Sequence, residues 1–287
     1  MMKIKSFFRR KFKKKKNSHI ILAKNDLVFL EYELSKSKII GIDTEFDWRT
    51  TYFPNLSLVQ IATETKLFLI DCLKVSPHTI LKKYLEDKNL LKIFHSVRSD
   101  TTVLSKCLDC RTENVFDIQL ADKMLTKGDI KSYGKIVNKY FGIKLKKTET
   151  NSNWLRRPLS DEQIKYAFDD IDFLLEIYKY QIKSLLKEGL SNKVFLYSEK
   201  EANLGNQSLK KIRLNKIQNK FSKRNIDIFI WREDLAEKQN IPPAYIFKDK
   251  NLKKLSKIDP NDNNAKRKIM TIFGDTYLTE SFISNFL

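Results

Sequence analysis

Glycine, proline and cysteine are scarce in this chain, with seven, six and three copies among 287 residues. So little glycine and proline argues against long flexible linkers and repetitive segments. Three cysteines are also too few for a disulfide framework. Cys107 and Cys110 have the spacing of a redox or metal-binding pair, but no second pair or histidine partner accompanies them. We therefore expect buried thiols in a reducing compartment, which predicts a cytoplasmic protein.

Long apolar runs are missing as well. No stretch approaches the roughly 18–20 apolar residues that a membrane-spanning helix needs, so we expect a soluble protein without a membrane partner. The first residues, MMKIKSFFRRKFKKKKN, begin like a signal peptide, but no apolar stretch or small-residue cleavage site follows. An organellar transit peptide is the other interpretation of this basic start, which contains no acid.

What the chain has in excess is positive charge, with a formal net charge of +20 at pH 7. Residues 1–16 contain nine Lys or Arg and no acid, and residues 204–224 contain seven Lys or Arg and no acid. Blocks of this kind suit contacts with phosphates, which need no sequence specificity. Solvated tails are the alternative interpretation of the first block. In the second block, Lys210, Lys211 and Arg213 are the predicted phosphate contacts.

Apolar patterning predicts a folded core, since 41% of the residues are hydrophobic and 11% are aromatic. Strand-like runs come first and then alternate with helical ones, which favours an α/β domain with a mixed sheet flanked by helices. The predicted strands cover residues 38–46, 56–63, 66–73, 90–95 and 114–118. The predicted helices of this domain cover residues 76–87, 97–107, 118–126, 131–141 and 160–189.

Helix-end signals support this assignment. Ser160 and Gln163 fit a capping box, Gly189 fits a helix end, and Ser76 fits an N-cap. The apolar pattern weakens after residue 190, and helical stretches return at 226–240, at 249–258 and after 259. We therefore predict a basic tail at 1–17, a main domain at 18–200 and a small all-α domain at 205–287.

Carboxylates at regular spacing are the most informative feature of the main domain. Asp43 and Glu45 leave one face of a strand, while Tyr166 and Asp170 share one face of a helix. Asp100 comes just after a strand, where α/β folds often place functional residues. Such acids repel each other when gathered in apolar surroundings, unless cations or buried protons compensate. Because carboxylates suit Mg²⁺ or Mn²⁺, the pattern predicts a two-metal site acting on a phosphodiester.

The segments around these residues resemble one family. In chain order they read DTEFDWRTTYFPNLSLVQIAT, KIFHSVRSDTTVL, FDIQLADKML and NWLRRPLSDEQIKYAFDDIDFLLEIY. They resemble the exonuclease motifs of the DEDD superfamily in its tyrosine-containing subclass, and in particular ribonuclease D. The later segment WREDLAEKQNIPPAYIFKDKNLKKLSKIDP is similar to the helicase-and-RNase-D C-terminal (HRDC) domain, a small helical nucleic-acid-binding module. One copy of this domain fits in the remaining length of the chain. The resemblance also implies a ribonuclease H-like fold for the main domain.

The resemblance implies roles for five residues. Asp43, Glu45, Asp100 and Asp170 would hold two Mg²⁺ or Mn²⁺ ions, with Glu45 and Tyr166 serving in catalysis. Tyr166 would orient the attacking water or help to deprotonate it. The ordinary tyrosine pKa near 10 makes the orienting role the more plausible one. The family spacing selects Asp170 over its neighbour Asp169, which spacing alone leaves open.

Four further residues match positions near the family's motifs and are predicted to contact substrate: His95, Trp154, Arg156 and Arg157. Trp154 can stack on a base and an arginine can bind a phosphate. A packed histidine at a strand end and a core tryptophan are the alternatives. Gln60 and residues 117–119 also match, and for these we expect a structural role.

The resemblance implies a metal-dependent 3′-5′ exoribonuclease that trims structured RNA, above all tRNA precursors, and releases 5′-nucleoside monophosphates. We expect RNA as the partner and a monomeric protein. One alternative is a DNA 3′-5′ exonuclease of the same subclass, with single-stranded DNA as its partner. Another is a catalytically inactive RNA-binding scaffold, against which the presence of all five site residues argues.

Overall fold

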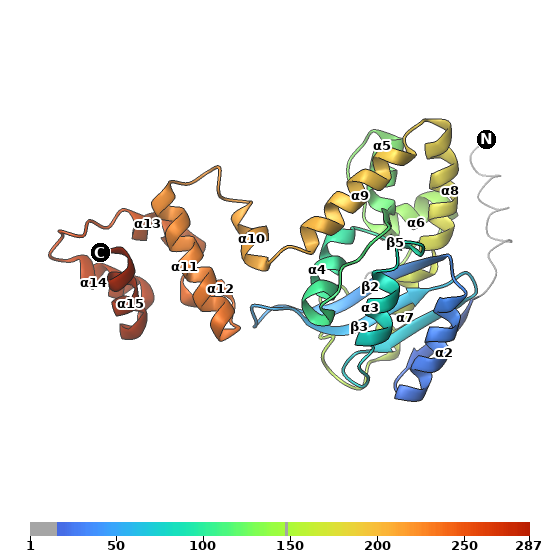
Figure 1. Ribbon diagram of the computed structural model, residues 1–287, viewed down its shortest axis with the longest axis horizontal. Coiled ribbons are helices and arrows are strands. Elements are labelled where there is room, and N and C mark those ends of the chain that lie inside the picture. The colour runs from blue at the N-terminus through green and yellow to red at the C-terminus, as the bar shows by residue number, and fades with distance from the viewer. Residues whose placement is uncertain (1–15, 147–148) are drawn as a thin grey trace. The chain divides into compact units, whose positions relative to one another are not determined.

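The computed structural model describes residues 16–146 and 149–287, which form two compact units (Figure 1). One unit comprises the chain up to Asp47 together with Asn55–Asn206, and the other comprises Trp48–Pro54 together with Gln207–Leu287. The predicted basic tail lies outside the described residues up to residue 15. Among the helices described, none combines the length and apolar character that crossing a membrane would require.

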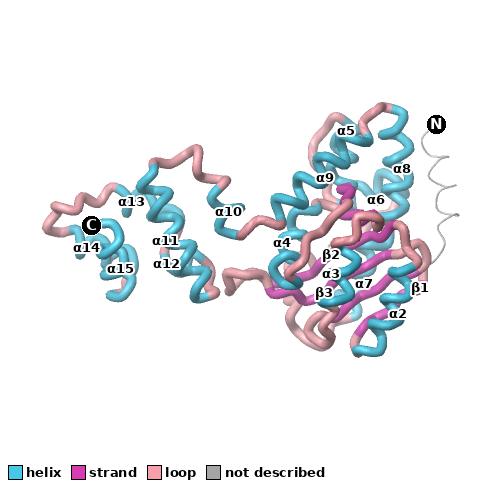
Figure 2. The backbone as a smooth tube through the Cα atoms, in the orientation of Figure 1, coloured by secondary structure: helices cyan, strands magenta, loops and turns pink. Residues whose placement is uncertain are grey.

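The first unit contains one six-stranded mixed sheet in the order β1-β4-β3-β2-β5-β6, which confirms the predicted fold class (Figure 2). Strand β3 runs antiparallel to both β2 and β4, and the other neighbours are parallel. The central strands are almost wholly buried, because helices cover both faces. The strands are β1 (Asn17–Ile21), β2 (Ile39–Asp47), β3 (Asn55–Ala62), β4 (Lys66–Asp71), β5 (Leu91–Phe94) and β6 (Val115–Asp117).

Alternation along β2 decides what each face of the sheet carries. Ile40 and Ile42 point into an apolar core shared with α2 (Lys24–Ser35), α3 (His78–Leu85) and α4 (Val97–Leu108). The opposite face of the sheet packs against α7 (Asp161–Asp172) and α8 (Leu174–Lys187), and a second core there includes α5 (Ile118–Thr126) and α6 (Tyr133–Phe141). Gly41 permits the close approach of α8, because a Cβ atom there would lie 3.0 Å from the Leu174 side chain.

The predicted helix over 160–189 is wrong in one respect, because it consists of α7 and α8 with a break at Phe173. Its start is as expected, with the Ser160–Gln163 capping box in place. At the break, the backbone N–H of Phe173 donates to the Tyr133 hydroxyl at 3.1 Å. A tertiary hydrogen bond thus marks the point where α7 ends and α8 begins.

Three elements of this unit have no counterpart in the sequence-based prediction: β1, α2 and α9 (Ser191–Gly205). Helix α2 has many apolar residues, but four of them are consecutive at 27–30, so its helical periodicity is weak. Strand β1 is only five residues long. Helix α3 also differs, since Pro77 occupies its N-cap position instead of Ser76, with no side-chain hydrogen bond.

The second unit is all helical. Its core is rich in aromatic side chains, and Trp231 makes edge-to-face contacts with Phe282 and Phe286. The stretch after residue 259 forms two helices, which Gly274 separates with its left-handed φ of 64°. The helices are α10 (Leu209–Leu214), α11 (Lys223–Gln239), α12 (Pro243–Ile246), η1 (Asp249–Asn251), α13 (Leu252–Ser256), α14 (Ala265–Phe273) and α15 (Thr276–Phe286).

Residues 48–54, between β2 and β3, contribute to the core of this helical unit. The Asn240 side-chain oxygen, at the end of α11, accepts hydrogen bonds from the backbone N–H groups of Tyr52 and Phe53, both at 3.1 Å. The Tyr52 ring is fully buried, and the Arg213 guanidinium lies 4.5 Å from its centroid. Sequence patterning gives no sign of this packing.

Candidate active site

Three of the predicted metal ligands lie together in the first unit. Carboxylate oxygens of Asp43, Glu45 and Asp170 all lie within 4.8 Å of one another. Asp43 and Glu45 project from the face of β2 that α7 covers, and Asp170 projects from the last turn of α7. Each side chain is half-buried. Strand spacing and helix spacing therefore bring three anions to one point.

Asp100 lies beside this group without belonging to the set within 4.8 Å. It is in the first turn of α4 and is 4% exposed, and its carboxylate accepts a 2.7 Å hydrogen bond from the Thr44 hydroxyl. The helix dipole adds favourable potential for an anion there. Thr44 separates Asp43 from Glu45 in the sequence, so the same strand holds two of the predicted ligands and fixes a third.

The electrostatics of the four acids are those of a site that needs positive charge. Burial, followed by the charges of Asp100 and Asp170, raises the pKa of Asp43 well above its usual range. Burial and the same two neighbours raise the pKa of Glu45 to about 9. Burial also raises the pKa of Asp100 to about 7. Carboxylate oxygens converging in this way fit hard divalent cations, because cations relieve both the repulsion and the lost hydration.

Tyr166 lies one helical turn before Asp170. Burial and then the charge of Asp170 raise the pKa of its hydroxyl, so the phenol stays protonated at neutral pH. Its hydroxyl is 3.5 Å from that of Thr150, and its ring packs 5.9 Å from that of Trp154. The hydroxyl can therefore donate a hydrogen bond within the site. Asp169, by contrast, is held in an ion pair with Lys165.

Comparison with known proteins shows which family the chain belongs to. A family model described as a 3′-5′ exonuclease matches residues 18–186, and one described as an HRDC domain matches residues 227–272. A ribonuclease D of Desulfotalea psychrophila is 31% identical over 258 residues, which cover 85% of this chain and 68% of that protein. The chain belongs to the ribonuclease D family of 3′-5′ exonucleases.

A second ribonuclease D relative aligns with this chain over a similar length. That of Sphingobium indicum is 28% identical over 246 residues, covering 82% of this chain and 63% of the relative. The chain thus spans about two thirds of the length of these two relatives.

Solved structures show the same fold. Escherichia coli RNase D matches with a TM-score of 0.78 and 21% identity, over 94% of this chain and 76% of that one. The catalytic core of Trypanosoma brucei RRP6 matches with a TM-score of 0.67 and 22% identity, over 95% and 81%.

Asp117 holds the turn before α4, in the segment KIFHSVRSDTTVL that resembles the second ribonuclease D motif. Its buried carboxylate accepts hydrogen bonds from the backbone N–H groups of Ser96 and Val97, both at 3.0 Å, and of Gln119, at 2.8 Å. Ser96 has a left-handed φ of 68° directly before α4. Asp117 therefore fixes the turn that starts the helix bearing Asp100, which agrees with the structural role expected for residues 117–119.

Tyr133 is a positioning residue that the sequence analysis did not identify. Its buried hydroxyl holds the Phe173 N–H at the α7–α8 break, three residues after Asp170. Burial and then the charges of Asp170, Asp172 and Asp43 raise the pKa of Tyr133, so the hydroxyl lies within electrostatic reach of the acidic group. A tyrosine in the first turn of a short amphipathic helix gives no signal of this role in the sequence alone.

Tyr133→Phe is expected to weaken Mn²⁺ binding about tenfold, because groups that orient metal ligands contribute on that scale. The ring contact with His95 would remain, while the hydrogen bond from the Phe173 N–H to the Tyr133 hydroxyl would be lost at a cost of about 1 kcal/mol. Titration calorimetry with Mn²⁺ measures the affinity. Tyr178→Phe, a half-buried tyrosine on α8, is the matched control. Unchanged Mn²⁺ affinity in Tyr133→Phe would limit Tyr133 to a role in stability.

The residues predicted to contact substrate have different surroundings. The His95 ring bonds the Lys131 carbonyl at 3.0 Å and faces Tyr133. Trp154 is 3% exposed, and it packs in an apolar cluster beside Tyr166. Arg157 makes two contacts to Asp71 at 2.6 and 2.7 Å, which favours a structural role, whereas Arg156 is exposed. Contact of these residues with substrate stays a prediction.

The basic residues of α10 are partly engaged within the second unit. Arg213 pairs with buried Glu233 at 2.8 Å, and Lys210 pairs with Asp234. Lys211 makes no ion pair with any described residue. Because Lys210 and Arg213 already pair with acids, Lys211 is the most available of the three for contact with a phosphate. Contact of these three residues with phosphates also stays a prediction.

Proposed function

We propose that this protein is a metal-dependent 3′-5′ exoribonuclease that trims the 3′ ends of structured RNA, most notably tRNA precursors. The observation that carries the proposal is the convergence of Asp43, Glu45 and Asp170 within 4.8 Å, beside Asp100. E. coli RNase D is described as an exoribonuclease involved in structured RNA processing, and T. brucei RNase D has been solved with the RNA U12. A monomer in the cytoplasm goes with this proposal.

The four acids would hold two divalent cations, Mg²⁺ or Mn²⁺. When bound, such ions neutralise charge on the scissile phosphate and favour attack by water. Carboxylate is the donor type that both ions prefer. The raised pKa values of Asp43 and Glu45, caused by burial and by neighbouring acids, support this assignment.

The residues around the acids position the reacting water. The protonated Tyr166 hydroxyl donates a hydrogen bond to it, which fixes its lone pair toward phosphorus. Glu45 lies in the acidic group one helical turn from Tyr166, and its carboxylate would accept a hydrogen bond from the same water. Attack forms one P–O bond and breaks the bond to the 3′ oxygen of the preceding nucleotide, which takes a proton. A 5′-nucleoside monophosphate is released.

A tRNA with a short 3′ extension tests this proposal against a DNA of matched sequence. With Mg²⁺ or Mn²⁺ we expect stepwise shortening of the RNA from its 3′ end and release of 5′-monophosphates, and in EDTA we expect none. Chromatography of the products distinguishes 5′- from 3′-monophosphates. Faster degradation of the DNA would indicate a DNA exonuclease of the same subclass. Tight RNA binding without degradation under any metal condition would indicate an inactive scaffold.

A further inference from the structure

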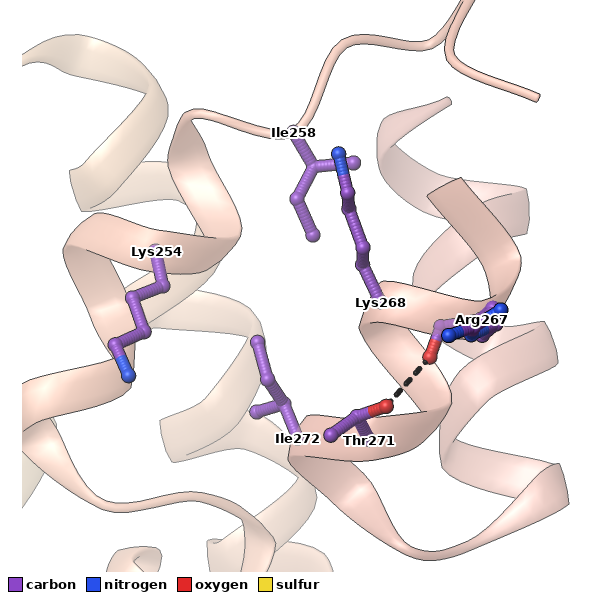
Figure 3. A pocket seen from close by; sticks show the side chains of 6 residues that line it. All are labelled: Lys254, Ile258, Arg267, Lys268, Thr271 and Ile272. Carbon is purple, nitrogen blue, oxygen red and sulfur yellow. Dashed lines mark hydrogen bonds between the residues drawn. The ribbon is translucent and has the colours of Figure 1, made fainter. Parts of the chain in front are cut away.

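The helical unit contains a pocket of about 390 Å³ whose lining combines apolar and cationic side chains (Figure 3). Ile258 and Ile272 belong to the apolar core of this unit and also line the pocket. Lys254 lies on one side, on α13, and Arg267 and Lys268 come from α14. Thr271 completes the lining, and its hydroxyl donates to the Arg267 carbonyl at 2.9 Å. No acid is among the lining residues.

Two of the three cations have no anionic partner within the described chain. Lys268 pairs with Asp262 at 2.5 Å. Lys254 and Arg267 are exposed, and neither makes an ion pair with a described residue. Arg267 is in the first turn of α14, where the helix dipole adds positive potential. The rim of the pocket therefore attracts anions, whereas the two isoleucines offer a surface for an apolar group.

A nucleotide of single-stranded RNA has both an apolar and an anionic part. The face of its base is apolar, and its phosphates are anionic. The volume of the pocket is in the range of small-ligand sites, about 300–1,000 Å³. We propose that the pocket between α13 and α14 binds one unstacked nucleotide of an RNA strand, with the base against Ile258 and Ile272 and phosphates at Lys254 and Arg267. The choice of RNA rests on the proposed function, and charge complementarity favours it over an acidic peptide.

Binding of a fluorescent single-stranded RNA to the full-length protein tests the role of the cations at the rim of the pocket. The measurement is made in EDTA, which prevents degradation of the RNA. The double variant Lys254→Gln/Arg267→Gln is expected to reduce the slope of log affinity against log salt by about 1.4, since each phosphate contact on a single strand contributes about 0.7. The matched control is Lys253→Gln/Lys257→Gln, two exposed lysines nearby that do not line the pocket and make no ion pair with a described residue. It should keep the wild-type slope. Equal reductions in both variants would overturn the pocket as a specific site.

Photo-crosslinking tests the position of the base. RNA containing 4-thiouridine, irradiated with the wild-type protein in EDTA, should crosslink to peptides that contain Ile258 or Ile272. The rim variant should lose these crosslinks. RNA that binds or crosslinks only elsewhere would overturn the inference, even for a protein that trims RNA. Crosslinks in the pocket of a protein that trims no RNA would instead refute the proposed function alone.

Discussion

Asp170→Asn is expected to reduce exonuclease activity by about a thousandfold or more. The substitution keeps the size and shape of the side chain and removes one anion from the group that Asp43, Glu45 and Asp170 form within 4.8 Å. A lost or misplaced cation removes several kcal/mol of transition-state stabilisation, and about 1.4 kcal/mol corresponds to a factor of ten in rate. Release of labelled nucleotide from a 3′-labelled RNA measures the rate. RNA affinity, measured in EDTA, should change little.

The neighbouring residue gives a matched control for this experiment. Asp169→Asn makes the same chemical change one position earlier in α7, at an acid that pairs with Lys165 instead of facing the other carboxylates. We expect its activity to stay near that of the wild type. Wild-type activity in Asp170→Asn, or an equal loss in both variants, would contradict the assignment of Asp170 as a metal ligand.

Without divalent cations, the free energy of unfolding is expected to fall as pH rises from about 4.5 to about 9. Burial raises the pKa of Glu45 from its ordinary value of 4.5 to about 9, and that of Asp100 from 3.8 to about 7, in the folded protein. In this pH window the unfolded chain has released protons that the folded chain still binds. Each such proton lowers the free energy of unfolding by about 1.4 kcal/mol per pH unit. Urea denaturation in EDTA at a series of pH values measures the effect.

Two comparisons assign the effect to the acidic site. Glu45→Gln does not titrate, so the metal-free variant should lose less stability across this window than the wild type does. Saturating Mg²⁺ or Mn²⁺ should stabilise the wild type most strongly at high pH, where cations replace protons. A wild type and a Glu45→Gln variant with parallel pH profiles would show that the charge of Glu45 is already compensated.

Local patterns were enough to predict five of the six strands, β2 to β6, and the side chains that share one face of β2 or of α7. The alternation along residues 39–47 identifies β2, and the same alternation places Asp43 and Glu45 on one face. Helical spacing relates Tyr166 to Asp170 in the same way. These predictions succeed because each depends on the geometry of a single strand or helix, which holds whatever packs against it.

Features fixed by distant contacts could not be predicted in this way. The break at Phe173 involves neither glycine nor proline, and it depends on the hydroxyl of Tyr133 forty positions earlier. The pairing of Arg157 with Asp71, 86 positions away, likewise has no signal in the local sequence. Helical spacing alone leaves Asp169 and Asp170 both open. The family resemblance favours Asp170, and the structure places Asp170 with Asp43 and Glu45 while Asp169 pairs with Lys165.

The path of the chain also limits how proteolysis can separate the two units and in what order they can fold during synthesis. The backbone passes between the two units three times, after Asp47, after Pro54 and after Asn206. A fragment that starts at Gln207 lacks Trp48, Tyr52 and Phe53, which pack in the core of the helical unit. During synthesis these aromatic side chains emerge from the ribosome long before the helices that cover them. The smaller unit is therefore completed last, and no single proteolytic cut yields it whole.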